Sequence, residues 1–178
     1  TANSYLISAP GFYRLPLVYG NAVTNGKTNE HAYKTENVGN TILSHFVDHA
    51  GHTITSPYIN VQNSTYPAVS ATVVWADEPL LVLNPTVRGR GAERYMDFEV
   101  SRENIRNGNA VVAVQDENGT TLWSWHLWFA PAEALDVVTC TNHDQVSYRF
   151  SKETLGWKYT AWMAPEEDNP HTVRIRIE

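Results

Sequence analysis

Residues 108–130, GNAVVAVQDENGTTLWSWHLWFA, constrain the fold of this chain more than any other segment. Residues 110–115 are rich in β-branched side chains, residues 116–119 contain an Asn-Gly turn pair that can adopt positive φ, and residues 120–129 continue as a second strand. Alternation directs the second strand's side chains to opposite faces: Leu122, Ser124, His126 and Trp128 on one, and Trp123, Trp125, Leu127 and Phe129 on the other. Because both faces carry large aromatic residues, we predict a β-hairpin whose second strand is central and covered on both sides, with Trp123 and Trp125 buried.

The rest of the chain repeats the pattern of short apolar runs separated by turn residues. We predict further strands at residues 4–8, 12–19, 71–75, 80–84, 95–100, 137–141, 146–150 and 172–177. Residues 20–41 read as a long loop, and a helix capped by Asn40 or Thr41 would run to His49. Many short strands with frequent turns indicate a mainly β chain, an immunoglobulin-like antiparallel β-sandwich with one short helix near 41–49 and long loops.

The composition sets limits on both organisation and partners. With 42% hydrophobic and 18% charged residues over 178 positions, the chain is globular and long enough for one full core. We expect a single β-sandwich domain over 1–178, with a small C-terminal lobe from about residue 135 as an option. The net charge of −6 and the lack of a basic cluster beyond Arg88, Arg90 and Arg94 disfavour nucleic-acid binding. No apolar run reaches the about 18 residues of a membrane span.

The single cysteine, Cys140, cannot form an internal disulfide. Its neighbours Val137, Val138 and Thr139 form a strand-like run, so we predict a buried structural thiol. The chain starts with Thr1 and not with Met, which is expected of a mature or trimmed fragment.

Three blocks of the sequence resemble a recurrent module of surface proteins from Bacteroides-type bacteria, often fimbrillin-like lipoproteins. They are the hairpin segment, the opening TANSYLISAPGFYRLPLVYGNAV, and the centre ILSHFVDHAGHTITSPYI followed by VVWADEP, together covering roughly residues 1–130. The resemblance implies a non-enzymatic cell-surface module, a fragment of a larger fimbria-like or adhesion-related lipoprotein. Its partners would be other surface or fimbrial subunits, and its location the extracellular face of the outer membrane or a fimbria.

Residues of catalytic type are present without a catalytic pattern. Ser124 and His126 share a strand face, but no Gly-x-Ser-x-Gly turn presents the serine. Carboxylate pairs for glycoside hydrolysis could be drawn from Asp77, Glu78, Asp97 and Glu99, of which the last two fit the polar face of one strand. We therefore assign no catalytic residue and no cofactor.

Two histidines one helical turn apart, His45 and His49, could share a Zn²⁺ or Ni²⁺ ion. The metalloprotease pattern requires Glu directly after the first histidine, where this chain has Phe46, and a third ligand is missing from the pattern. We favour surface or capping histidines and assign no metal site.

Aromatic residues near the C-terminus are the best candidates for ligand binding. Trp157, Tyr159 and Trp162 surround Gly156 and precede an acidic loop. Exposed and coplanar rings would stack on sugars, which makes a carbohydrate-binding module that captures host or plant glycans the alternative function. Rings buried against the core would form a packed lobe, which is the interpretation that we favour for them.

Overall fold

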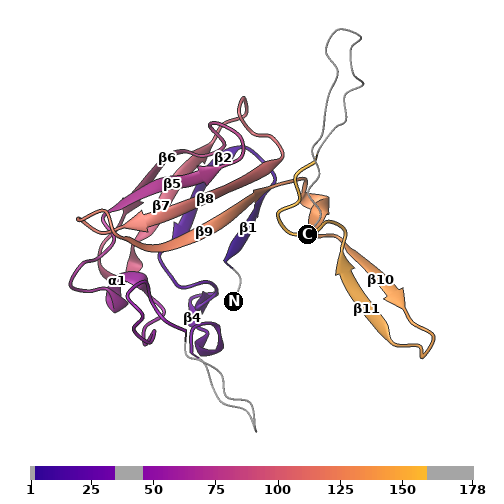
Figure 1. Ribbon diagram of the computed structural model, residues 1–178, viewed down its shortest axis with the longest axis horizontal. Helices are drawn as coiled ribbons and strands as arrows, with labels where there is room; N and C mark the ends of the chain where they lie inside the picture. The colour runs from indigo at the N-terminus through magenta and orange to yellow at the C-terminus, as the bar shows by residue number, and fades with distance from the viewer. Residues whose placement is uncertain (1–2, 35–45, 160–178) are drawn as a thin grey trace, which may run out of the picture.

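Two β-sheets pack face to face in the computed structural model, which describes residues 3–34 and 46–159 (Figure 1). The first sheet, sheet A, has the order β1-β9-β8-β5 and contains β1 (Ser4–Ile7), β5 (Ser70–Ala76), β8 (Gly108–Gln115) and β9 (Thr121–Phe129). The second, sheet B, has the order β2-β7-β6 and contains β2 (Gly11–Pro16), β6 (Leu83–Arg88) and β7 (Tyr95–Val100). All of these strand pairs are antiparallel except β1–β9, which is parallel. The predicted mainly β chain and its β-sandwich are confirmed.

The remaining described elements are short. They are β3 (Val23–Thr24), β4 (Lys27–Thr28), β10 (Val137–Thr141), β11 (Ser147–Ser151), the helix α1 (Ile59–Gln62), and the 3₁₀ helices η1 (Glu30–Ala32), η2 (Gly91–Glu93) and η3 (Ala132–Leu135). No helix within residues 3–34 and 46–159 is long and apolar enough to cross a lipid bilayer.

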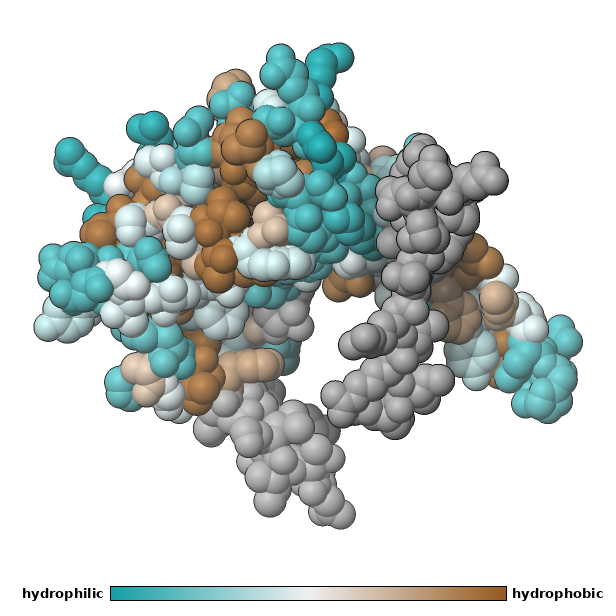
Figure 2. Space-filling view, turned by 45° about the horizontal axis from the view of Figure 1, so that its top comes forward, coloured by the Kyte–Doolittle hydropathy of each residue, from teal (hydrophilic) through white to brown (hydrophobic). Residues whose placement is uncertain are grey.

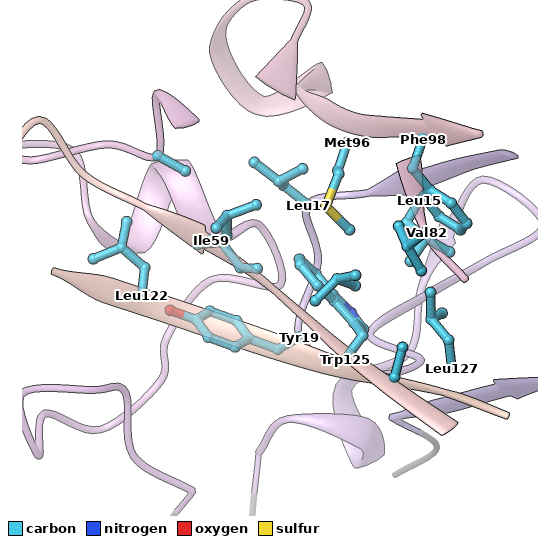
Figure 3. Close-up of a cluster of buried hydrophobic side chains, with 14 of the residues drawn as sticks. Leu15, Leu17, Tyr19, Ile59, Val82, Met96, Phe98, Leu122, Trp125 and Leu127 are labelled. Carbon is cyan, nitrogen blue, oxygen red and sulfur yellow. The ribbon is translucent and has the colours of Figure 1, made fainter. Parts of the chain in front are cut away.

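The core lies between the two sheets (Figure 3). Trp125 and Leu127 of β9 point toward Leu15 of β2 and Met96 and Phe98 of β7, and all belong to one cluster of buried side chains. Strand β7 contributes to this core because its side chains alternate between the two faces of the sheet, and every second residue is buried. Trp125 is only 1% exposed, so its burial was predicted correctly.

The β8–β9 hairpin is confirmed, with Ala110 opposite Leu127 and Val112 opposite Trp125. The strict alternation on β9 was wrong at its start. A β-bulge shifts the register beyond Val114, and Leu122 joins the core cluster although alternation assigned it to the opposite face. Trp123 is partly buried at the edge of the same cluster.

The outer face of β9 is also covered. Trp128 is buried in a second small cluster with Ala130 and Ala134, against which Leu6 of β1 packs. Because β9 also lies between β1 and β8 in the sheet, the prediction of a central strand covered on both sides is confirmed.

The strand predicted at 80–84 begins later, at Leu83, and continues to Arg88. Leu81 and Val82 are buried, but as a loop contribution to the core and not as part of a strand. Pro85 does not end the strand because β6 is an edge strand with a register shift between Leu83 and Thr86, where a missing N–H is tolerated.

The helix predicted near 41–49 is not found in the part of that range that the structure describes. Val47 forms a β-bridge to Thr53, and Asp48 accepts hydrogen bonds from the backbone N–H groups of Ala50 and His52. This carboxylate competes with helical hydrogen bonding, which explains the turn. The described α-helix lies instead at Ile59–Gln62. Residues 35–45 and the strand predicted at 172–177 lie outside the described residues.

Candidate functional site

The hairpin β10–β11 forms a two-stranded sheet of its own and does not continue either sheet of the sandwich (Figure 1). Its turn is organised by Asn142, whose side-chain oxygen accepts the backbone N–H groups of Asp144 and Val146 at 3.0 and 2.9 Å. The strands were predicted at nearly the observed positions, and they pair with each other and not with a strand of either sheet. An antiparallel pair needs only its own turn to close, so local sequence does not decide which sheet it joins.

One face of the hairpin is apolar. Val138 lies opposite Phe150 and Cys140 opposite Tyr148, and directly opposed residues of an antiparallel pair share a face. The other face is mostly polar, with Thr139 opposite Arg149 and Thr141 opposite Ser147, and carries Val137 at the base of the hairpin. The two faces of the hairpin therefore differ in chemistry. In antiparallel sheets with this alternation, the apolar face is usually packed against another surface and the polar face is in water.

Neither face is covered by the described residues. All ten strand residues are exposed, and Phe150 and Tyr148 retain 55% and 49% of their accessible surface. Figure 2 shows apolar residues toward the base of the hairpin and hydrophilic ones at its tip. The prediction of a buried thiol at Cys140 was wrong because this residue lies on the exposed apolar face.

Residues 153–159, which we call the return segment, lead back from the hairpin to the outer face of sheet A. Trp128 Nε1 donates to the carbonyl oxygen of Trp157 at 2.9 Å, and the Asn109 side chain donates to the carbonyl oxygen of Gly156 at 3.0 Å. Lys158 Nζ contacts the carboxylate of Glu78 at 2.6 Å. The hairpin is thus attached to the sandwich on both sides, by residues 130–136 before it and by the return segment after it.

Of the three aromatic residues predicted to bind a ligand, the structure describes two. Trp157 is 51% and Tyr159 46% exposed, so their rings are neither free platforms nor fully packed. The Tyr159 hydroxyl donates to Glu153 at 3.0 Å, and its ring lines a groove with Ile105 and Pro131. Trp162 lies outside the described residues.

Ser124 and His126 lie on the same face of β9, but they do not form a catalytic pair. His126 Nδ1 contacts the hydroxyl of Ser4 at 3.1 Å, and its Nε2 contacts Asn109 Oδ1 at 2.9 Å. Because the Asn109 amide nitrogen donates to Asp77 and Gly156, its oxygen accepts, and Nε2 of His126 carries the proton. Burial lowers the pKa of His126, partly opposed by the Asp77 carboxylate, and so favours the neutral imidazole.

The acidic residues considered for catalysis are split between the two sheets. Asp77 accepts the backbone N–H of Asn109 at 2.9 Å, and Glu78 pairs with Lys158, on the sheet A side. Asp97 and Glu99 lie on the outer face of β7, as their spacing predicts. The Arg14 guanidinium beside Asp97 lowers the pKa of that carboxyl. A carboxylate whose charged form is stabilised by an ion pair is a poor proton donor.

Two further groups of residues were considered from the sequence, the histidines near His49 and the arginines near Arg88. His49 lies in an exposed turn, and His45 is not described. Within residues 3–34 and 46–159, no three His, Cys, Asp or Glu side chains gather as metal ligands would. Arg88 faces Asp97, whereas Arg94 donates to the carbonyl oxygen of Ala68, so these arginines do not form one basic surface.

Two surface features were missed from the sequence. Val74 and Trp75 are exposed on β5, an edge strand of sheet A, next to a register shift. Phe12 is exposed on the outer face of β2, and here the alternation with Tyr13 and Leu15 was a usable signal.

No family model, curated protein or solved structure matches this chain.

Proposed function

We propose that this chain is a non-enzymatic cell-surface module of a fimbria-like or adhesion-related bacterial protein, attached to a neighbouring subunit through the apolar face of β10–β11. The observation that carries the proposal is the exposure of Phe150 and Tyr148 on that face. The resemblance of residues 1–130 to fimbrillin-like surface proteins supplies the class of partner. We expect the chain to lie on the extracellular face of the outer membrane or in a fimbria.

The physical argument starts from the stability of the hairpin. An isolated two-stranded hairpin is marginally stable in water, and it becomes stable when its apolar face packs against another surface. Val138, Tyr148 and Phe150 are contiguous through the register and would supply the apolar centre of such an interface. Thr139 and Arg149, on the opposite face, would remain in water. The attachment of both hairpin ends to the sandwich would hold this face in position for a partner.

The non-enzymatic part of the proposal is supported by the engagement of the candidate catalytic groups. His126 contacts Ser4 and Asn109, and Asp97 is paired with Arg14. These contacts give each group a structural partner. A hydrolase screen in which His126→Ala abolishes turnover while circular dichroism shows an intact fold would contradict this part.

The test of attachment uses two neighbouring residues on opposite faces. We expect the wild-type chain to bind purified fimbriae of Bacteroides-type bacteria saturably in surface plasmon resonance. Phe150→Glu should weaken binding at least about tenfold, equal to about 1.4 kcal/mol. Arg149→Glu changes charge one residue away on the polar face and should preserve binding. Absence of wild-type binding, or equal loss in both variants, would refute attachment by this face.

Glycan capture is the second candidate function, favoured by the half-exposed rings of Trp157 and Tyr159. Both residues lie in the return segment, whose backbone is bonded to the side chains of Trp128 and Asn107, so the backbone that carries the rings is held in place. Tryptophan fluorescence titrated with a panel of host and plant glycans tests this candidate. A saturable change that is lost in Trp157→Ala would support it, and no change across the panel would contradict it.

A further inference from the structure

The outer face of sheet B carries a groove of about 660 Å³ that is distinct from the hairpin and the return segment. Its floor is the outward row of the central strand β7, and its walls come from β2 and β6. The side chains that carry the argument are Phe12, Arg14, Asn84, Arg88, Asp97 and Glu99. Asn84 and Arg88 of β6 both line the groove, and a strand extends about 13 Å over four residues, so the groove accommodates an extended ligand.

The charged side chains of the groove are paired with one another. Arg14 donates to both oxygens of Asp97, from Nε at 2.8 Å and from Nη2 at 3.0 Å, and Arg88 lies 3.6 Å from the same carboxylate. The Arg14 guanidinium also lies 3.6 Å from the centre of the Tyr95 ring. A bidentate pair stacked on an aromatic ring holds its geometry before any ligand arrives.

At one end of the groove, two polar side chains have hydrogen-bonding atoms without a partner among the described residues. The side chains of Asn84 and Glu99 form no hydrogen bond or ion pair with any other described residue. Phe12 lies opposite Glu99 in the β2–β7 register and is 88% exposed. Asn84 has a φ of 51° where the register of β6 shifts, and such irregularities redirect side chains at binding sites. An amide, a carboxylate and an aromatic ring therefore converge at this end.

The charges select the class of ligand. Arg14 and Arg88 are balanced by Asp97 and Glu99, so the groove has no net charge. An anionic ligand would meet the unpaired carboxylate of Glu99, and a cationic one would meet two guanidinium groups. A neutral ligand rich in hydroxyls avoids both penalties, because hydroxyls donate to carboxylates and also accept from amides and guanidinium groups.

We propose that this groove binds a neutral oligosaccharide, with one sugar ring stacked on Phe12 and its hydroxyls bonded to Asn84 and Glu99. An apolar aromatic face suits the C–H face of a sugar, and the polar groups beside it fix its orientation. The proposal does not depend on attachment through the hairpin or on the rings of the return segment.

The experiment titrates the ¹⁵N-labelled chain with neutral oligosaccharides of glucose, xylose, mannose and N-acetylglucosamine, and follows amide chemical shifts. We expect saturable shifts on β2, β6 and β7, weakened at least about tenfold by Phe12→Ala and by Glu99→Gln. Phe12 is too exposed for its removal to threaten the fold. Tyr66→Ala, which removes an exposed aromatic ring outside the groove, is the matched control and should bind like the wild type.

Three outcomes would overturn the proposal. They are no binding by any member of the panel, shifts confined to the return segment, and equal binding by the wild type and Phe12→Ala. A titration with a sulfated oligosaccharide and with a lysine-rich peptide tests the charge argument, and tighter binding of either would also overturn it.

Discussion

The indole Nε1 of Trp128 donates a 2.9 Å hydrogen bond to the carbonyl oxygen of Trp157. Trp128 belongs to the central strand β9, and Trp157 lies in the return segment beyond the hairpin. This bond joins two parts of the chain that have no strand pairing between them. It also explains why a buried indole on the outer face of the sheet has its donor satisfied.

Removal of this donor should loosen the return segment. Trp128→Phe keeps an aromatic ring and removes the N–H, so we expect a loss of about 1 kcal/mol or more in the free energy of unfolding. Hydrogen exchange at residues 153–159 should become faster. Trp157→Phe is the control, because its contribution to the bond is a main-chain carbonyl that the substitution retains. Equal exchange in all three proteins would contradict this role of Trp128.

Core packing should depend strongly on Trp125. Trp125→Ala should lower the free energy of unfolding by about 3–5 kcal/mol in urea denaturation, the scale for removal of a buried aromatic side chain. Trp125→Phe should cost less, because Nε1 of Trp125 has no hydrogen-bond partner among the described residues. Trp75→Ala, at a half-exposed position, should change stability by less than about 1 kcal/mol. A similar loss for Trp75→Ala and Trp125→Ala would show that burial does not govern these sites.

Stability should depend on pH through His126. Burial lowers its pKa in the folded state, so the unfolded chain takes up a proton first as the pH falls below about 6.5. The unfolded state is then favoured, and the free energy of unfolding should decrease from pH 7 toward about pH 5. His126→Gln should show a weaker decrease over the same range. Urea denaturation of both proteins measures the difference, and parallel pH profiles would exclude His126 as the source.

The β8–β9 turn should require glycine at one position only. Gly119 has a φ of 80° and open space where a Cβ atom would lie, so Gly119→Ala adds backbone strain without a clash. We expect a cost of about 1–2 kcal/mol in thermal or chemical unfolding. Asn118→Ala, at a position without positive φ, should cost less. Equal stability of Gly119→Ala and the wild type would show that the turn adapts to the substitution.

The sequence predicted strands correctly where one local pattern, such as side-chain alternation or a turn motif, was enough to define them. The β7 strand follows from strict alternation, and the β8–β9 hairpin follows from two strand-like runs joined by turn residues. The prediction at 80–84 was wrong because an apolar loop and an apolar strand look alike in sequence. Leu81 would be buried in a loop or in a strand, and only the packing of the sheets decides which of the two forms here.

The candidate surfaces were less accessible to sequence reasoning. Exposure of Trp157, Tyr159 and Phe12 depends on what lies against them in three dimensions, and a single sequence does not report this. The groove on sheet B brings together residues from three strands that are far apart in the chain. Alternation could place Phe12 on an outer face, but it could not place Glu99 opposite it, because that register is set by long-range pairing.

The sequence by itself determined the β-rich class, the β8–β9 hairpin and the positions of the strands β10 and β11, because turn chemistry and side-chain alternation act over a few residues. Tertiary structure alone decided that β10–β11 projects from the sandwich with Cys140 and Phe150 exposed. It also decided that the return segment binds to Trp128 and Asn109. These outcomes depend on contacts between distant segments, whose free energies arise from packing and hydrogen bonds that no local pattern encodes.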